Sequence, residues 1–202
     1  LPQFKKVTHE VAQWSFDDCF NEQELNDWEQ RNLKVLAKHP KGNSSLNLKY
    51  VCELKIDGFK VVLTYEKGVL VRAATRGDGK VGEDVTENVK TIESVPIVLE
   101  RPIDITVEGE IWLSKNELER INKEQINKGE QPYANPRNLA AGSIRQLDPK
   151  MAASRHLDSY IYDIAKYDKL PDTQEEELEL LRTLGFKVNR HQRVCKTIDE
   201  VI

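Results

Sequence analysis

Val61-Val62-Leu63-Thr64-Tyr65-Glu66-Lys67-Gly68-Val69-Leu70-Val71-Arg72-Ala73-Ala74 contains two apolar runs separated by a short polar connection. Runs rich in valine and leucine favour strands, and a short connection that ends in glycine is typical of a β-hairpin. We therefore predict two adjacent antiparallel strands over residues 61–65 and 69–74.

The flanking sequence adds further strands and capped helices. Asn21, Ser114 and Asn135 each precede a segment with helical spacing or composition and are predicted as N-caps, and a short helix is predicted to end near Ile92. We predict strands over residues 48–56, 103–113, 157–164 and 186–194, a loop over 40–45, and helices over 114–128, from 135 and over 173–184. The pattern favours an α+β fold of mainly antiparallel sheets with flanking helices. No linker in the sequence is strong enough to divide the chain.

Composition excludes several classes of protein. The 202 residues hold 30 Lys and Arg against 34 Asp and Glu, a net charge of −4, so a wholly basic nucleic-acid coat is excluded but a local basic patch is not. No apolar run approaches the roughly 20 residues of a membrane span, and no signal stretch opens the chain. Three well-separated cysteines without a CxxC pair favour reduced thiols in the cytoplasm. The missing initiator Met predicts a processed or excised chain.

The segment Tyr50-Val51-Cys52-Glu53-Leu54-Lys55-Ile56-Asp57-Gly58 alternates in polarity. In a strand, Tyr50, Cys52, Leu54 and Ile56 would share an apolar core face, and the charged residues would share the other. That charged face is either solvated or the floor of a polar cleft.

A second strand repeats the arrangement, with Glu108 and Glu110 on one face and Val107 and Ile111 on the other. If both charged faces line one cleft, the acids could hold a metal or a ribose and Lys55 could act as a nucleophile. A lysine with its ordinary pKa of about 10.4 is protonated at neutral pH, so it would first have to lose its proton.

These residues carry a resemblance to a known family. Lys55-x-Asp57-Gly58 has the K-x-D-G form of covalent nucleotidyltransferases, a weak pattern alone. Three longer blocks resemble the NAD-dependent bacterial DNA ligases: Cys52-Glu53-Leu54-Lys55-Ile56-Asp57-Gly58, Ala74-Thr75-Arg76-Gly77-Asp78-Gly79-x-x-Gly82-Glu83-Asp84-Val85-Thr86-x-Asn88-Val89-x-Thr91-Ile92, and Asn135-Pro136-Arg137-Asn138-x-Ala140-Ala141-Gly142-Ser143-x-Arg145-Gln146-Leu147-Asp148-Pro149. Their order is that of the family, and the resemblance extends from about His9 to the end of the chain.

The resemblance implies a covalent nucleotidyltransferase core, ATP-grasp-like in fold, in which Lys55 becomes adenylylated by NAD with magnesium present. The residues that it implies for binding the nucleotide are Ser15, Phe16, Glu53, Asp57, Arg76, Glu110 and Tyr162. Around Ser15 the family has Pro-Met-Leu-Ser-Leu where this chain has Ala12-Gln13-Trp14-Ser15-Phe16, so only the serine is kept. Tyr162 would stack on adenine, although a core tyrosine is an equal alternative. The metal ligands are not assigned.

Two further segments have competing interpretations. Gly77-Asp78-Gly79-Lys80-Val81-Gly82 spells G-x-G-x-x-G, but the acids Asp78, Glu83 and Asp84 crowd the position of a pyrophosphate and hairpins replace βαβ units. A tight acidic turn is favoured. The helix that begins at Asn135-Pro136 is either an ordinary capped helix or a phosphate site. The resemblance implies that Arg137 and Arg145 contact DNA phosphates at a nick.

The resemblance further implies one partial adenylation domain over residues 1–202, without the C-terminal part of that domain and the flanking ligase domains. The expected protein is a cytoplasmic, monomeric enzyme that seals nicked duplex DNA in replication and repair, and the fragment alone would ligate poorly or not at all. Two alternatives are an ATP- or GTP-using nucleotidyltransferase and a catalytically inactive module that binds nicks.

Overall fold

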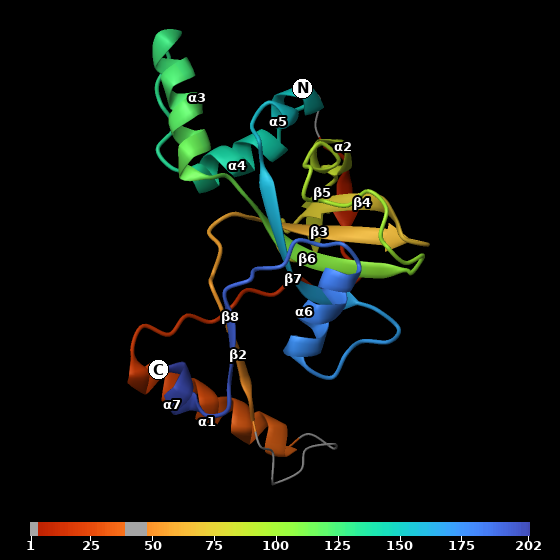
Figure 1. The fold of residues 1–202 in the computed structure, drawn as a ribbon, viewed down its shortest axis with the longest axis vertical. Coiled ribbons are helices and arrows are strands. Elements are labelled where there is room, and N and C mark those ends of the chain that lie inside the picture. The colour runs from red at the N-terminus through yellow and green to blue at the C-terminus, as the bar shows by residue number, and fades with distance from the viewer. Residues whose placement is uncertain (1–3, 39–47) are drawn as a thin grey trace. The chain divides into compact units, whose positions relative to one another are not determined.

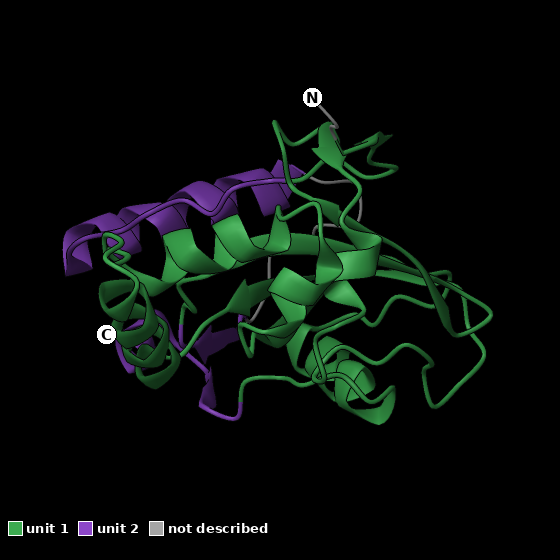
Figure 2. Cartoon of the chain, turned by 90° about the horizontal axis from the view of Figure 1, so that it is seen from above, with its two compact units in different colours: residues 1–13, 55–189 green, residues 14–54, 190–202 purple. Residues whose placement is uncertain are grey.

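A computed structural model describes residues 4–38 and 48–202. Contacts divide the chain into two compact units: Leu1–Gln13 with Lys55–Asn189, and Trp14–Leu54 with Arg190–Ile202 (Figure 2). No linker in the sequence marks this division, because each unit combines two stretches that lie far apart along the chain. The predicted loop over residues 40–45 lies outside the described residues.

The larger unit contains a four-stranded sheet in which every neighbouring pair is antiparallel (Figure 1). Its order is β4-β3-β6-β7, with β3 at Phe59–Glu66, β4 at Val69–Thr75, β6 at Ile105–Trp112 and β7 at Asp158–Lys166. The predicted hairpin of β3 and β4 is confirmed. It turns at Lys67 and Gly68, both with positive φ, a backbone conformation that glycine adopts without strain.

One face of this sheet is the core. Val61, Leu63, Val107, Ile111 and Ile161 alternate along β3, β6 and β7 and are fully buried. Alternate residues of a strand share a face, so the residues between them lie on the opposite face. The sheet therefore presents an apolar face and a second, more polar face that carries Glu108 and Glu110.

Among the residues that the structure describes, the larger unit also contains five helices. They are α2 at Thr86–Val89, α3 at Lys115–Asn127, α4 at Pro136–Ile144, α5 at Pro149–Ala153 and α6 at Gln174–Thr183. Ser114, Asn135 and Thr173 accept hydrogen bonds from backbone amides three residues ahead, which satisfies donors left over at a helix start. The predicted caps at Ser114 and Asn135 are confirmed, and Thr173, predicted only as the start of a helix, also caps it. A two-stranded sheet pairs β1, Lys6–Thr8, with β5, Val81–Glu83, and neither strand was predicted.

The smaller unit pairs β2, Tyr50–Glu53, with β8, Gln192–Cys195, and carries α1 at Glu22–Lys38 and α7 at Ile198–Val201. The predicted helix start at Asn21 is confirmed, in an arrangement similar to a capping box. Asn21 Oδ1 accepts a hydrogen bond from Glu24 N at 2.9 Å, and a Glu24 carboxylate oxygen accepts one from Phe20 N at 2.8 Å.

Two predicted strands are shorter than the sequence pattern indicated. The strand predicted over residues 48–56 ends at Glu53, and Leu54, predicted to lie in the core, is 58% exposed. The strand predicted over residues 186–194 appears only at Gln192–Cys195. Both errors have one cause: β2 and β8 pair with each other over four residues only, and alternation in sequence does not show where a pairing partner ends.

Gly109 lies in the central strand β6, where a side chain has no room. A Cβ there would overlap the Tyr160 carbonyl oxygen and come within 2.5 Å of Ile161 Cδ1. We expect Gly109→Ala to lower the free energy of unfolding by about 1–3 kcal/mol through overpacking. Chemical denaturation measures it.

Gly142 in α4 is the matched control, since a Cβ there meets no atom within 4 Å. Gly142→Ala is expected to raise stability by about 0.5–1 kcal/mol, because alanine loses less backbone entropy in a helix. Equal effects at both glycines would contradict the packing argument.

Candidate functional site

The polar face of the larger sheet gathers charged side chains from three strands. Glu108 and Glu110 come from β6, where Glu108 is 6% exposed. Lys60 of β3 lies directly opposite Glu110, and Asp163 of β7 lies directly opposite Glu108. Side chains directly opposite each other on antiparallel strands lie on the same face and within reach of each other. The face is therefore a cluster of ionisable groups, of which Glu108 is buried and Lys60, Glu110 and Asp163 are partly buried.

Lys60 and Glu108 form an ion pair within this cluster. Lys60 Nζ lies 2.5 Å from Glu108 Oε2, and the two side chains are 13% and 8% exposed. Burial, followed by the charge of Glu108, raises the pKa of Asp163, while Lys60 opposes that shift. Removing one partner of a buried pair leaves an uncompensated charge, so the two residues depend on each other.

Glu110 has the most perturbed environment among the carboxylates of the site. Its Oε2 atom is buried and has no hydrogen-bond partner among the residues that the structure describes. Burial raises the pKa of Glu110 to about 7, although Lys55, Arg137 and Lys60 act to lower it and Asp57 adds a small rise. A partly buried carboxylate that has a strongly raised pKa and one buried oxygen without a hydrogen-bond partner is typical of a ligand-binding position.

Tyr162 and Arg76 extend the same cluster. Burial raises the pKa of the Tyr162 hydroxyl, the carboxylates of Glu110, Glu108 and Asp163 add to that rise, and Arg76 opposes it. Tyr162 lies where β7 is irregular, because the register shifts between Glu108 and Gly109 of its neighbour. Electrostatic interactions within the larger unit therefore link six of the predicted residues: Lys55, Asp57, Arg76, Glu110, Arg137 and Tyr162.

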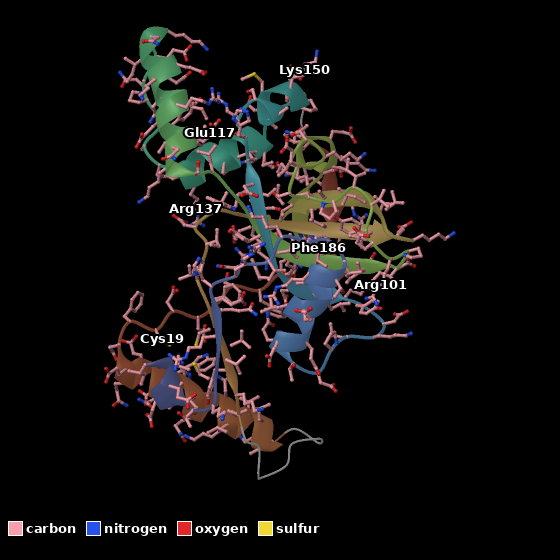
Figure 3. All side chains as sticks on the ribbon, viewed as in Figure 1. Cys19, Arg101, Glu117, Arg137, Lys150 and Phe186 are labelled. Carbon is pink, nitrogen blue, oxygen red and sulfur yellow. The ribbon has the colours of Figure 1, made fainter. Side chains whose placement is uncertain are left out.

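The Lys55 segment differs from its prediction. Lys55 and Asp57 are exposed and lie between β2 and β3, so they do not share a strand face with Glu53. The reason is that β2 ends at Glu53. Asp57 Oδ1 instead accepts a hydrogen bond from Arg137 Nη1 at 3.3 Å, and Arg137 is in the first turn of α4 (Figure 3).

Arg145 follows the end of α4 and pairs with an acid of the glycine-rich segment. Its Nε atom donates to Glu83 Oε2 at 2.9 Å, and Lys6 Nζ lies 3.1 Å from the other oxygen of Glu83. Burial alone would raise the pKa of Glu83, but Lys6 and Arg145 together hold it below its usual value. Glu83 therefore orients Arg145 and does not repel an anion by itself.

The glycine-rich segment forms a turn around its own acid. Gly77 and Gly79 have positive φ, and Asp78 Oδ1 accepts hydrogen bonds from the amides of Lys80 and Val81 at 2.9 and 2.7 Å. These two amides are thus occupied by a side chain of the same turn. The arrangement agrees with the predicted acidic turn and not with a dinucleotide cradle, whose amides point at phosphate.

Ser15, Phe16 and Glu53 belong to the smaller unit, where Phe16 is 69% exposed and Glu53 ends β2. Their predicted roles toward the nucleotide stay predictions. Conversely, sequence reasoning gave no role to Lys60 or Asp163. Strand alternation from Lys60 through Val62 to Thr64 could have placed the lysine on the polar face, but Asp163 depends on the irregularity in β7.

Neither a metal-binding cluster nor a membrane-spanning helix is present in residues 4–38 and 48–202. This part of the chain contains no group of three or more His, Cys, Asp or Glu residues that could hold a metal ion. None of the helices in the same ranges is long and apolar enough to cross a membrane.

Comparison with known proteins gives a consistent result over the full length. The family model "NAD-dependent DNA ligase adenylation domain" matches residues 1–202. DNA ligases of Bacillus pumilus (strain SAFR-032), Bacillus subtilis (strain 168) and Thermotoga neapolitana are 47%, 46% and 47% identical over 203 aligned residues, covering 100% of this chain. The chain spans 29%, 29% and 28% of the length of these relatives. The chain belongs to the family of NAD-dependent DNA ligase adenylation domains.

Proposed function

We propose that this chain is part of the adenylation domain of an NAD-dependent DNA ligase, that Lys55 is its nucleophile, and that the whole protein seals nicks in duplex DNA during replication and repair. Family membership over the full chain carries the proposal. The cluster around Glu110 supports it, because a buried polar face beside the K-x-D-G lysine suits a nucleoside. We further propose an ATP-grasp-like nucleotidyltransferase core in a cytoplasmic monomer.

The proposed reaction has three steps. The unprotonated Lys55 amine attacks the adenylyl phosphorus of NAD, so that an N–P bond forms, the bridging P–O bond breaks and nicotinamide mononucleotide leaves. The 5′-phosphate at a nick then attacks the same phosphorus, forms a P–O bond and releases lysine. Finally the 3′-hydroxyl attacks the activated 5′-phosphate, loses its proton and expels AMP. In each step one bond to phosphorus forms and another breaks, so no oxidant or reductant is needed.

The residues of the cluster have separate tasks in this scheme. Tyr162 would stack on the adenine, Glu110 would accept hydrogen bonds from the ribose, and Arg76 would contact the nucleotide with a fixed positive charge. Ser15, Phe16, Glu53 and Asp57 are likewise proposed to bind the nucleotide. Magnesium, as proposed for the whole protein, would neutralise charge on the phosphoryl oxygens.

The deciding experiment uses the full-length protein that contains this chain. It is incubated with magnesium and NAD labelled in the adenylyl phosphate, and the label is located by mass spectrometry of peptides. Label on Lys55 supports the proposal. Labelling from ATP or GTP but not from NAD would favour the nucleotidyltransferase alternative, and nick binding without any label would favour the inactive binding module.

Arg145 provides a separate prediction for DNA binding. We expect Arg145→Ala to weaken binding of the full-length protein to nicked duplex and to reduce the slope of log affinity against log salt by about 1, as for one lost phosphate contact. Fluorescence anisotropy at several salt concentrations measures the slope. Arg182→Ala is the matched control, because Arg182 is paired with Glu179 on α6 and has no proposed DNA contact. An unchanged slope in the Arg145 variant would exclude the phosphate contact.

A further inference from the structure

Lys60 is a largely buried amine of the candidate site that the proposed reaction does not use. Its side chain is 13% exposed, its Nζ atom lies 2.5 Å from Glu108 Oε2, and its position on β3 is directly opposite Glu110 on β6. A lysine is seldom buried to this extent unless it is paired. The position of this ion pair therefore requires an explanation beyond ordinary surface pairing.

Three carboxylates share the face that Lys60 occupies. Lys60 pairs with Glu108, and its charge also acts to lower the pKa values of Glu110 and Asp163, both of which burial raises. The one amine thus counters negative charge on two neighbouring strands, β6 and β7. Without it, the three acids would lose their most buried counter-charge, and like charges in a desolvated place protonate rather than coexist.

We infer that Lys60 is a positioning residue of the nucleotide site, where it fixes the Glu108 carboxylate and supplies the buried positive charge that leaves the neighbouring Glu110 carboxylate ionised for the nucleotide. This inference rests on the proposed function, since it gives Glu110 a ribose to bind. Lys60 itself touches neither substrate nor reacting atoms and acts through Glu110.

The other charged or titratable groups that face Glu110 come from four parts of the unit. They are Lys55 and Asp57 before β3, Arg137 of α4, Glu108 of β6 and Tyr162 of β7. Lys55, Asp57 and Arg137 are exposed, whereas Lys60 is mostly buried. Lys55 and Arg137 lower the pKa of Glu110 more than Lys60 does. Water and salt screen exposed charges more strongly than buried ones, so the effect of Lys60 is the one expected to persist as the salt concentration rises.

The first test removes or keeps the charge of one side chain of the Lys60–Glu108 pair while its size stays similar. Full-length enzyme carrying Lys60→Met, Lys60→Arg or Glu108→Gln is compared with wild type in the rate of lysine–AMP formation from NAD between pH 5 and 9. Lys60→Met should slow the reaction about fivefold at pH 7, because a one-unit rise in the pKa of Glu110 cuts its ionised fraction from about one-half to about one-tenth. Lys60→Arg keeps the charge and should remain close to wild type.

The two neutralising variants should move the pH profile in opposite directions. Lys60→Met shifts the acid limb of the profile to higher pH. Glu108→Gln shifts it to lower pH, because a negative charge is removed and Lys60, without its Glu108 partner, acts more strongly on Glu110. A merely structural pair would lower the unfolding temperature in both variants and move neither limb, which would overturn the inference. Lys123→Met, exposed on α3, is the matched control for loss of a lysine charge.

The second test needs no catalysis. Unfolding midpoints are measured between pH 5 and 9 for two pairs of proteins. The first pair is wild type and Glu110→Gln, and the second is Lys60→Met and the double variant with both changes. The difference in stability within each pair changes with pH as Glu110 titrates. The pH at which this change is half complete should lie about one pH unit higher in the Lys60→Met pair. Equal midpoints in the two pairs overturn the inference. If wild-type Lys55 takes no label from NAD, the proposed function fails, and this cycle still decides whether Lys60 controls Glu110.

Discussion

Lys55→Arg in the full-length protein is expected to reduce lysine–AMP formation from NAD by at least about 10⁴-fold, the scale of loss when an enzyme's covalent nucleophile is removed. Arginine keeps the positive charge and the length of the side chain, but its guanidinium stays protonated and cannot attack phosphorus. Lys55 is exposed, so the change should alter the free energy of unfolding by no more than about 0.5 kcal/mol. Labelled NAD and peptide mass spectrometry measure the loss.

Step-specific assays make this prediction sharper. The last step does not use the Lys55 amine as a nucleophile, so sealing of a nick that already carries AMP on its 5′-phosphate should fall far less than ligation from NAD. Binding to nicked duplex should persist. Lys90→Arg is the control, because Lys90 is paired with Glu87 at the end of α2 and has no proposed role. Normal labelling of the Lys55→Arg protein would refute the assignment of the nucleophile.

Glu110→Gln is expected to stabilise the protein and to weaken its use of NAD. Burial raises the pKa of Glu110 to about 7 from an ordinary value of 4.5, so the folded state binds this proton more tightly than the unfolded state. Stability from this group is complete below pH 4.5 and is lost as pH rises through 7. At pH 8 the neutral amide avoids that penalty, a gain of about 1–3 kcal/mol after allowance for solvent screening.

The same substitution should cost about 10- to 100-fold in apparent affinity for NAD, since hydrogen bonds to a charged group contribute about 1.5–3 kcal/mol. Thermal unfolding against pH measures the first effect, and the NAD dependence of labelling measures the second. Glu119→Gln, at an exposed position of α3, should change neither. A stability gain that is the same at pH 5 and pH 8 would show that Glu110 does not titrate in this range.

The sequence predicted local structure well where the determinant lies within a few residues. The caps at Asn21, Ser114 and Asn135 depend on one side chain and a backbone amide three residues ahead, and all three are present. The same holds for the turn at Lys67 and Gly68. The sequence failed at the ends of the strands near Leu54 and after Phe186, where the determinant is the length of a distant partner.

By itself the sequence determined the helices and their caps, the hairpin, the α+β class and the family. Local backbone structure depends on residues that are adjacent in the chain, and the family is recognised from the order of residues in its motifs. Only the tertiary structure decided that β6 lies at the centre of the sheet between β3 and β7. That order places Lys60 opposite Glu110 and Asp163 opposite Glu108, pairings between residues about 50 positions apart. The register of such distant strands follows from the packing of the apolar face as a whole, and burial then sets the charge state of the acids on the other face.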